Sequence, residues 1–118
     1  MNKRPNSSFR AVHAGNFRAS SHDVHIEGRS TLVAECFDVH GHKQRAAIDL
    51  NDCLTNNGGR IEWARGGNFA ASAQHIRLKH DENMLEAELG DGRGGWQHCE
   101  VNLNERIGND NGRLHFMG

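Results

Sequence analysis

The hexapeptide GNFRAS at residues 15–20 returns as GNFAAS at residues 67–72, 52 positions later. Three further blocks recur in the same order at a spacing of 53: LVAEC (32–36) with LEAEL (85–89), IDLN (48–51) with VNLN (101–104), and NNGGRI (56–61) with NDNGRL (109–114). Self-similarity at a nearly fixed period is the signature of a duplicated structural unit. The sequence therefore predicts two copies of one unit, residues 15–66 and 67–118, joined at Gly66-Gly67. Residues 1–14 stand outside both copies and are predicted to be a flexible extension.

Apolar side chains alternate with polar ones along short segments of each copy. Leu32, Ala34 and Cys36 show this period of two, and Leu85, Ala87 and Leu89 repeat it. Alternation of this kind predicts half-buried strands rather than helices. The fold class is therefore predicted to be all-β, with four or five short strands in each copy.

Turn-forming residues separate the predicted strands. Hairpin turns are expected at Gly28-Arg29, at residues 81–83, at Asp91-Gly92 and at Asn111-Gly112. A single helical turn is expected at residues 51–54, with Asn51 or Asp52 as its cap, and a twin at residues 104–107.

A unit of about 50 residues buries too small a share of its surface to be secure alone. The two copies are therefore expected to share one core, with strands exchanged between them. The predicted aromatic anchors of this core are Phe17, Phe69, Trp63 and Phe116.

Composition and charge disfavour several classes of partner. The 118 residues carry 14 basic and 15 acidic side chains, for a formal net charge of −1. This balance disfavours a nucleic-acid partner held by phosphate contacts. No apolar run approaches the roughly 20 residues of a membrane span, so no membrane partner is expected. Residues 1–14 lack the apolar stretch of a secretory signal.

The three cysteines, Cys36, Cys53 and Cys99, are odd in number and widely spaced. They fit either buried free thiols in a reducing compartment, the favoured interpretation, or one disulfide with a spare thiol. A cytoplasmic location is therefore expected, with secretion by a route that needs no signal peptide as the alternative.

The repeated blocks closely resemble those of the cyanovirin-N homolog (CVNH) family. The resemblance spans residues 15–117 and involves an ordered tandem array rather than a single motif. It implies two pseudo-symmetric halves, each with a three-stranded antiparallel sheet and a β-hairpin, and with strands exchanged between the copies. It also implies a lectin that binds mannose-rich glycans, typically with α1-2-linked mannose, uses no metal or other cofactor, and catalyses no reaction.

The cysteine pattern departs from that of the cyanobacterial members, which carry one disulfide in each repeat. The matching pairs in this chain are Ser21 with Cys36 and Ala73 with Leu89, and neither pair can form a disulfide. The chain therefore resembles the disulfide-free, fungal-like branch of the family. Each lost crosslink is expected to cost a few kcal/mol, part of which apolar burial at Leu89 and Ala73 should offset.

The resemblance places one sugar site at each end of the molecule. Sugar hydroxyls both donate and accept hydrogen bonds, so such a site needs short polar side chains and accessible backbone on a preformed surface. The first site combines the start of copy 1 with the end of copy 2. Its residues are Gly15, Asn16, Ala19, Ser20, Phe37, Val39, Asn109, Asp110, Asn111 and Gly112. Phe37 replaces an acid of the family, and its ring either stacks on a sugar or shields an apolar edge.

The second site is formed by the middle of the chain. Its residues are Thr55, Asn56, Asn57, Gly58, Gly67, Asn68, Ala71, Ser72, Gly90, Asp91, Gly92 and Arg93. Thr55 and Gly58 replace acidic residues of the family, and each lost charge-assisted bond could cost about 1.5–3 kcal/mol. The first site is therefore expected to bind, and the second to be weak or silent.

Other chemistries are disfavoured by the sequence. His40 and His42 have the spacing of a chelating pair, but the segment is predicted to be a solvated loop. Glu35 and Glu88 could suggest glycoside hydrolysis, but they are equivalent positions of the two copies rather than an acid and a nucleophile. The competing class is a protein-binding module with degenerate sugar sites. The expected state is a monomer, with a strand-exchanged dimer through Gly66-Gly67 as the alternative.

Overall fold

The computed structural model describes residues 15–79 and 83–118, and the predicted all-β fold is confirmed. The first copy contains η1 (Phe17–Ser20), β1 (Ser21–Glu27), β2 (Thr31–Phe37), β3 (Lys43–Asp49), η2 (Leu50–Asp52), β4 (Leu54–Asn57) and β5 (Arg60–Trp63). The second contains η3 (Phe69–Ser72), β6 (Ala73–Leu78), β7 (Met84–Gly90), β8 (Trp96–Asn102), η4 (Leu103–Glu105), β9 (Ile107–Asp110) and β10 (Arg113–Phe116). The predicted extension 1–14 and most of the turn predicted at 81–83 lie outside the described residues.

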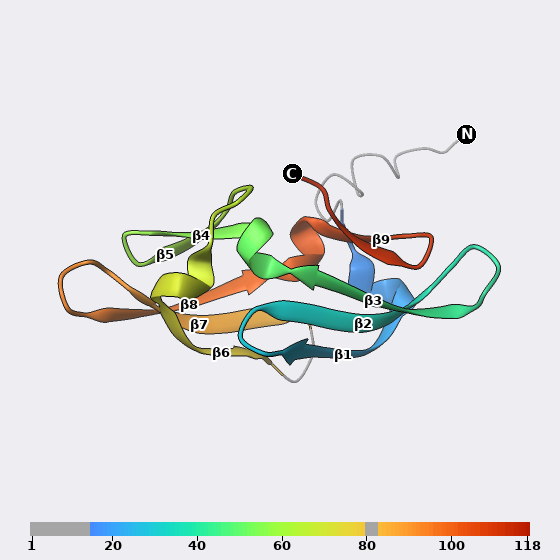
Figure 1. The fold of residues 1–118 in the computed structure, drawn as a ribbon, viewed down its shortest axis with the longest axis horizontal. Helices are drawn as coiled ribbons and strands as arrows, with labels where there is room; N and C mark the ends of the chain where they lie inside the picture. Colours follow the sequence, from blue (N-terminus) through green and yellow to red (C-terminus); the bar gives the residue numbers. More distant parts are fainter. Residues whose placement is uncertain (1–14, 80–82) are drawn as a thin grey trace.

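The strands form two antiparallel three-stranded sheets, β1-β2-β3 and β6-β7-β8, and two hairpins, β4-β5 and β9-β10. Figure 1 shows the sheets arranged along the long axis of a molecule that measures 53 × 30 × 25 Å. Hairpin β4-β5 of the first copy lies beside the sheet of the second copy, and hairpin β9-β10 lies beside the sheet of the first. This is the strand exchange expected from the small size of each copy. Within the described ranges, no helix is long and apolar enough to cross a membrane.

One asparagine of each copy binds the 3-10 helix that opens the other copy. The carbonyl of Asn51 accepts the amide of Asn68 at 2.8 Å, and its side-chain Oδ1 accepts the amide of Ala70 at 2.9 Å. Asn104 repeats this arrangement with the amides of Asn16 and Arg18, at 2.7 and 3.1 Å. Each 3-10 helix that opens a copy is therefore held in place by the opposite copy.

One core runs through both halves and contains the two equivalent phenylalanines. Phe17 and Phe69 are both fully buried, and each follows an asparagine in the left-handed conformation. Trp63 and Phe116 are half-buried instead, and they stack on one another with ring centroids 5.7 Å apart and planes 20° apart. Two of the four predicted anchors are thus core residues, and the other two join the halves at the edge of the core.

All three cysteines are free. Cys36 lies opposite Ser21, whose hydroxyl donates to its Sγ at 3.3 Å, and Ala73 lies opposite Leu89. At the two positions where the resemblance implies lost disulfides, one half has a hydroxyl–thiol contact and the other has apolar packing. Burial raises the pKa of the Cys53 thiol to about 12, so this thiol is unreactive at neutral pH.

Two local predictions were wrong in detail. The turn η2 begins at Leu50 and is capped by Asp49, whose carboxylate accepts the Asn51 amide at 2.9 Å; Asn102 caps η4 in the same way. Asp49 takes this role because it ends strand β3 with the extended backbone that a cap requires. Asp91-Gly92 is not a two-residue turn but the start of a five-residue loop, which the amide of Asp91 closes by donating to the carbonyl of Gly95 at 3.1 Å.

Candidate binding clefts

Two open clefts occupy equivalent positions at the two ends of the molecule. Each lies between the tip of an exchanged hairpin and the loop that follows the central strand of a sheet. The first cleft, about 470 Å³, is lined by Asp38, Gln44, Arg45, Asp110, Asn111, Gly112 and Arg113. The second, about 420 Å³, is lined by Gly58, Gly59, Arg60, Asp91, Arg93 and Gln97.

The hairpin tips are two-residue turns whose backbone requires special residues. Asn111 and Gly112 have φ of 52° and 91°, and Gly58 and Gly59 have φ of 63° and 99°. Two successive positive φ angles define the type I′ turn, which favours Asn-Gly and Gly-Gly because asparagine and glycine tolerate this region. The turn predicted at Asn111-Gly112 is confirmed, and the tip at Gly58-Gly59 has the same turn type.

An asparagine anchors each hairpin to the opposite copy. Nδ2 of Asn109 donates to the Ser20 hydroxyl at 2.8 Å and to the Phe37 carbonyl at 2.9 Å. Its Oδ1 accepts the Gly112 amide at 2.8 Å, which fixes the turn. In the second half, Asn56 makes the equivalent bonds with Ser72, Gly90 and Gly59 at 2.8, 2.9 and 2.7 Å. Each asparagine side chain thus forms hydrogen bonds with three separate segments of the chain.

An aspartate shapes the loop on the other side of each cleft. Oδ1 of Asp38 accepts the amides of His40 and His42, both at 2.9 Å. Asp91 accepts the amides of Arg93 and Gly95 at 2.7 and 3.1 Å. These backbone hydrogen bonds lower the pKa of each carboxyl, chiefly the His42 amide for Asp38 and the Arg93 amide for Asp91.

We expect both loops to loosen in acid. Because the folded-state pKa of each aspartate is lowered, the stabilisation is present above the ordinary value of 3.8 and is lost as the pH falls through the lowered value. Amide NMR shifts of His42 and Gly95 should therefore titrate together below pH 3.8. Asp91→Asn should remove the Gly95 titration and leave that of His42; an unchanged Gly95 titration would contradict the assignment.

The two clefts differ at the hairpin tip. Oδ1 of Asn111 accepts the Val39 amide at 2.8 Å and so links the tip to the facing loop. The equivalent residue of the second cleft is Gly58, which has no side chain to make this link. A hydrogen bond therefore joins the two walls of the first cleft, and the second cleft lacks an equivalent bond.

The structure distributes the residues predicted for the first site over three places. Asp110, Asn111 and Gly112 line the cleft, and Ser20, Phe37 and Asn109 meet in the anchoring hydrogen bonds. Val39 lies in the facing loop, with 76% of its surface exposed. Gly15 packs against Ile107 and Asn16 pairs with Gly108, both outside the cleft lining, while Ala19 is exposed on η1. The Phe37 ring meets His22 edge-on, with centroids 5.2 Å apart.

The residues predicted for the second site divide in the same way. Gly58, Asp91 and Arg93 line the cleft, with Gly92 in the same loop, and Asn56, Ser72 and Gly90 form the anchor. Thr55 and Asn68 pair in a β-bridge, and Gly67 packs against Leu54 and Thr55. Asn57 donates to Glu62 at 3.2 Å, and Ala71 is exposed on η3.

Several residues that line the clefts were not predicted from the sequence. They are Asp38, Gln44, Arg45 and Arg113 in the first cleft and Gly59, Arg60 and Gln97 in the second. Most of them could have been found from the repeat, because the same residue type stands at equivalent positions 53 residues apart. The pairs are Asp38 with Asp91, Gln44 with Gln97, and Arg60 with Arg113.

The side chains considered for other chemistries occupy ordinary surface positions. His40 and His42 lie in the loop between β2 and β3, as predicted, with ring centroids 6.3 Å apart. Glu35 on β2 pairs with Lys43 at 3.4 Å, and Glu88 on β7 bonds to Gln74 and His75 at 2.8 and 3.1 Å. The two glutamates lie on different sheets, so they do not form a facing pair.

The chain is thus a small β-protein of two similar copies with exchanged hairpins and one polar cleft at each end. Residues 17–115 match the family model of the CVNH domain, and the chain belongs to this family. It is 33% identical over 100 residues to a cyanovirin-N homolog of Tuber borchii, covering 84% of this chain and 95% of that one. It is 31% identical over 107 residues to a homolog of Neurospora crassa, covering 84% and 96%.

Solved structures of related proteins share the fold closely. The NMR structure of the CVNH protein of Gibberella zeae has a TM-score of 0.79 and 38% identity, covering 88% of this chain and 99% of that one. A MoCVNH3 variant, solved in complex with (N-GlcNAc)4, has a TM-score of 0.83 and 29% identity, with 88% and 98% coverage. The predicted family resemblance is thereby confirmed.

Proposed function

We propose that this protein is a non-catalytic lectin that binds mannose-rich glycans with α1-2-linked mannose, mainly through the first cleft. The observation that carries this proposal is the pair of preformed polar clefts, whose walls are fixed by the Asn109 and Asn56 anchors. Membership of the CVNH family and the sugar complex of a relative with 29% identity support it.

The first cleft offers the mixture of groups that a sugar requires. Asp110 supplies a carboxylate, Gln44 an amide, and Arg113 a guanidinium, beside the exposed backbone of the turn. A sugar hydroxyl can donate a hydrogen bond to the carboxylate and accept one from the guanidinium. The side-chain amide can both donate and accept. A single shallow cleft of this kind should bind with micromolar to millimolar affinity, about −4 to −8 kcal/mol.

The bond between Asn111 and Val39 supports the stronger role of the first cleft. It holds the hairpin tip against the facing loop before a ligand arrives, so less ordering is left to occur on binding. Gly58 leaves the second cleft without this constraint, which favours weaker binding there.

An NMR titration with α1-2 mannobiose tests the proposal. We expect shifts of the amides of Val39 and residues 109–113, and much smaller shifts at residues 56–60. Asn111→Gly should weaken binding at the first cleft about tenfold. This factor equals about 1.4 kcal/mol, the contribution of one hydrogen bond between neutral groups. Equal shifts at both hairpin tips would contradict the asymmetry, and the absence of any shift would contradict the specificity.

The converse variant, Gly58→Asn, gives a matched control. The backbone of Gly58 has a φ of 63°, close to that of Asn111, and nothing lies within 4 Å of the position where a Cβ would be built. The variant should therefore fold normally and gain affinity at the second cleft. A parallel titration with (N-GlcNAc)4, the sugar in the relative's complex, tests the alternative specificity.

A protein-binding module is the second candidate function. The exposed apolar side chain of Val39 at the rim of the first cleft favours it, since such side chains suit protein contacts as well as the apolar faces of sugars. Silence on a glycan array, together with a normally folded protein, would decide for this alternative.

We further propose a monomer in a reducing, cytoplasmic setting. Gly66 has a φ of 64° at the joint between the copies, which lets the chain fold back on itself, and three free thiols suit a reducing compartment. Size-exclusion chromatography with light scattering should give a mass near 13.1 kDa; a mass of twice this value would indicate exchange between two chains.

A further inference from the structure

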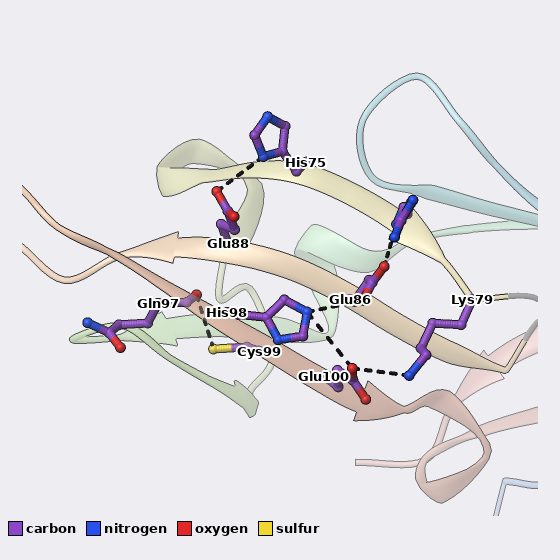
Figure 2. A network of polar contacts seen from close by, with 9 residues as sticks. His75, Lys79, Glu86, Glu88, Gln97, His98, Cys99 and Glu100 are labelled. Carbon is purple, nitrogen blue, oxygen red and sulfur yellow. Dashed lines mark hydrogen bonds and ion pairs between the residues drawn. The ribbon is translucent and has the colours of Figure 1, made fainter.

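The outer face of the β6-β7-β8 sheet carries a cluster of charged side chains away from both clefts. A shallow cavity of about 450 Å³ on this face is lined by His75, Ile76, Arg77, Glu86, Ala87, Glu88 and His98. None of these residues lines the second cleft, which lies in the same half. Figure 2 shows the imidazole of His98 between the carboxylates of Glu86 and Glu100.

Strand register brings these three side chains together. Glu86 on β7 lies directly opposite Glu100 on β8, and His98 precedes Glu100 by two residues, so all three point to the same face. Nε2 of His98 lies 3.0 Å from Oε1 of Glu86 and 3.9 Å from Oε2 of Glu100. The three donor atoms all lie within 4.8 Å of one another.

The spacing of these atoms fits one metal ion. Metal–nitrogen and metal–oxygen bonds of about 2.1 Å in a tetrahedral site place neighbouring ligand atoms about 3.4 Å apart. The two distances from His98, 3.0 and 3.9 Å, lie on either side of this value. Small side-chain rotations would therefore suffice to coordinate an ion.

Neighbouring cations hold the carboxylates in place without using every oxygen. The side chain of Glu86 is only 11% exposed, and its Oε2 is bonded by Nε of Arg77, which leaves Oε1 directed at His98. Nζ of Lys79 lies 3.2 Å from Oε2 of Glu100, the oxygen that faces His98, and among the described residues leaves Oε1 of Glu100 unused. The two cations orient the ligands and also lower the affinity for a metal cation.

We infer that Glu86, His98 and Glu100 form a binding site for one divalent transition-metal ion such as Zn²⁺, with water completing its coordination. An imidazole nitrogen and two carboxylate oxygens are ligands that Zn²⁺ commonly takes in proteins. The first half of the molecule cannot form this site, because Val33, Arg45 and Ala47 occupy the equivalent positions. The site is therefore a property of the second copy alone.

Titration of the full chain with ZnCl2 tests this inference. The imidazole ¹⁵N resonances of His98 should shift at one equivalent of Zn²⁺, and calorimetry should show a 1:1 component. His98→Gln and Glu100→Gln should each weaken this component at least tenfold, while amide spectra establish that both variants are folded. The Glu100 side chain is 33% exposed at the sheet surface, and glutamine has nearly the same shape, so the second variant is structurally mild.

His75→Gln provides the matched control. His75 lies on the same face and bonds Glu88 at 3.1 Å, but it is outside the proposed ligand set. The variant should bind Zn²⁺ as the unaltered chain does. Because the chain has nine histidines, adventitious binding elsewhere is expected. Unchanged His98 resonances, or equal Zn²⁺ affinity with and without His98, would overturn the inference.

Discussion

Replacing Phe69 by alanine should lower the free energy of unfolding by about 3–5 kcal/mol. The side chain is fully buried in the core that both copies share, so its loss leaves a cavity that rigid strands cannot fill. Small domains have a total stability of about 5–15 kcal/mol, so this loss removes a large part of it. Urea unfolding followed by tryptophan fluorescence would measure the change.

Phe17→Ala is the matched comparison. Phe17 occupies the equivalent position and is equally buried, so its replacement should cost a similar amount. Both variants should unfold in a single transition, because one core serves both copies. Two separate transitions, with only one moved by each variant, would show that the halves are independent and would contradict the shared core.

Asn109→Ala should abolish glycan binding at the first cleft and lower the free energy of unfolding by about 1.5–4.5 kcal/mol. Its amide makes three hydrogen bonds within 2.9 Å, to Ser20, Phe37 and Gly112. Each such bond contributes about 0.5–1.5 kcal/mol net. Without the anchor, the hairpin tip is no longer held against the facing loop. Chemical denaturation and the mannobiose titration measure the two effects.

Asn56→Ala separates stability from binding. Asn56 makes the equivalent three bonds in the second half, so the loss of stability should be similar. Binding at the first cleft should remain, because none of these bonds involves that end of the molecule. If both variants lost binding equally, a general loss of structure rather than the first cleft would be responsible.

The repeated blocks predicted the family, the alternation within them predicted the fold class, and the small size of each copy predicted the exchange of strands. Alternation along residues 32–36 and 85–89 predicted half-buried strands. Both segments are strands, but each is the central strand of its sheet and is buried more fully than predicted, because Val33 and Glu86 on the other face are buried too. The hairpin tip at Asn111-Gly112 was predictable because few residues adopt two successive positive φ angles. These features depend on local sequence or on internal similarity.

The geometry of the clefts depends on longer-range contacts. The cap at Asp49 was missed because local sequence does not show at which residue strand β3 ends. Asp91-Gly92 alone predicts a tight turn, whereas the five-residue loop depends on the hydrogen bond that the Gly95 amide donates to the Asp91 carboxylate. The cluster of Glu86, His98 and Glu100 depends on strand register, which residue spacing alone does not reveal.

Each cleft is assembled from one hairpin and one sheet loop that belong to different copies. A single ancestral copy could complete its cleft only by pairing with another chain, which would make its two ends identical. Fusion into one polypeptide removes that constraint. The Asn111–Gly58 difference between the tips is then the kind of divergence that a gene duplication permits, since one end can specialise while the other drifts.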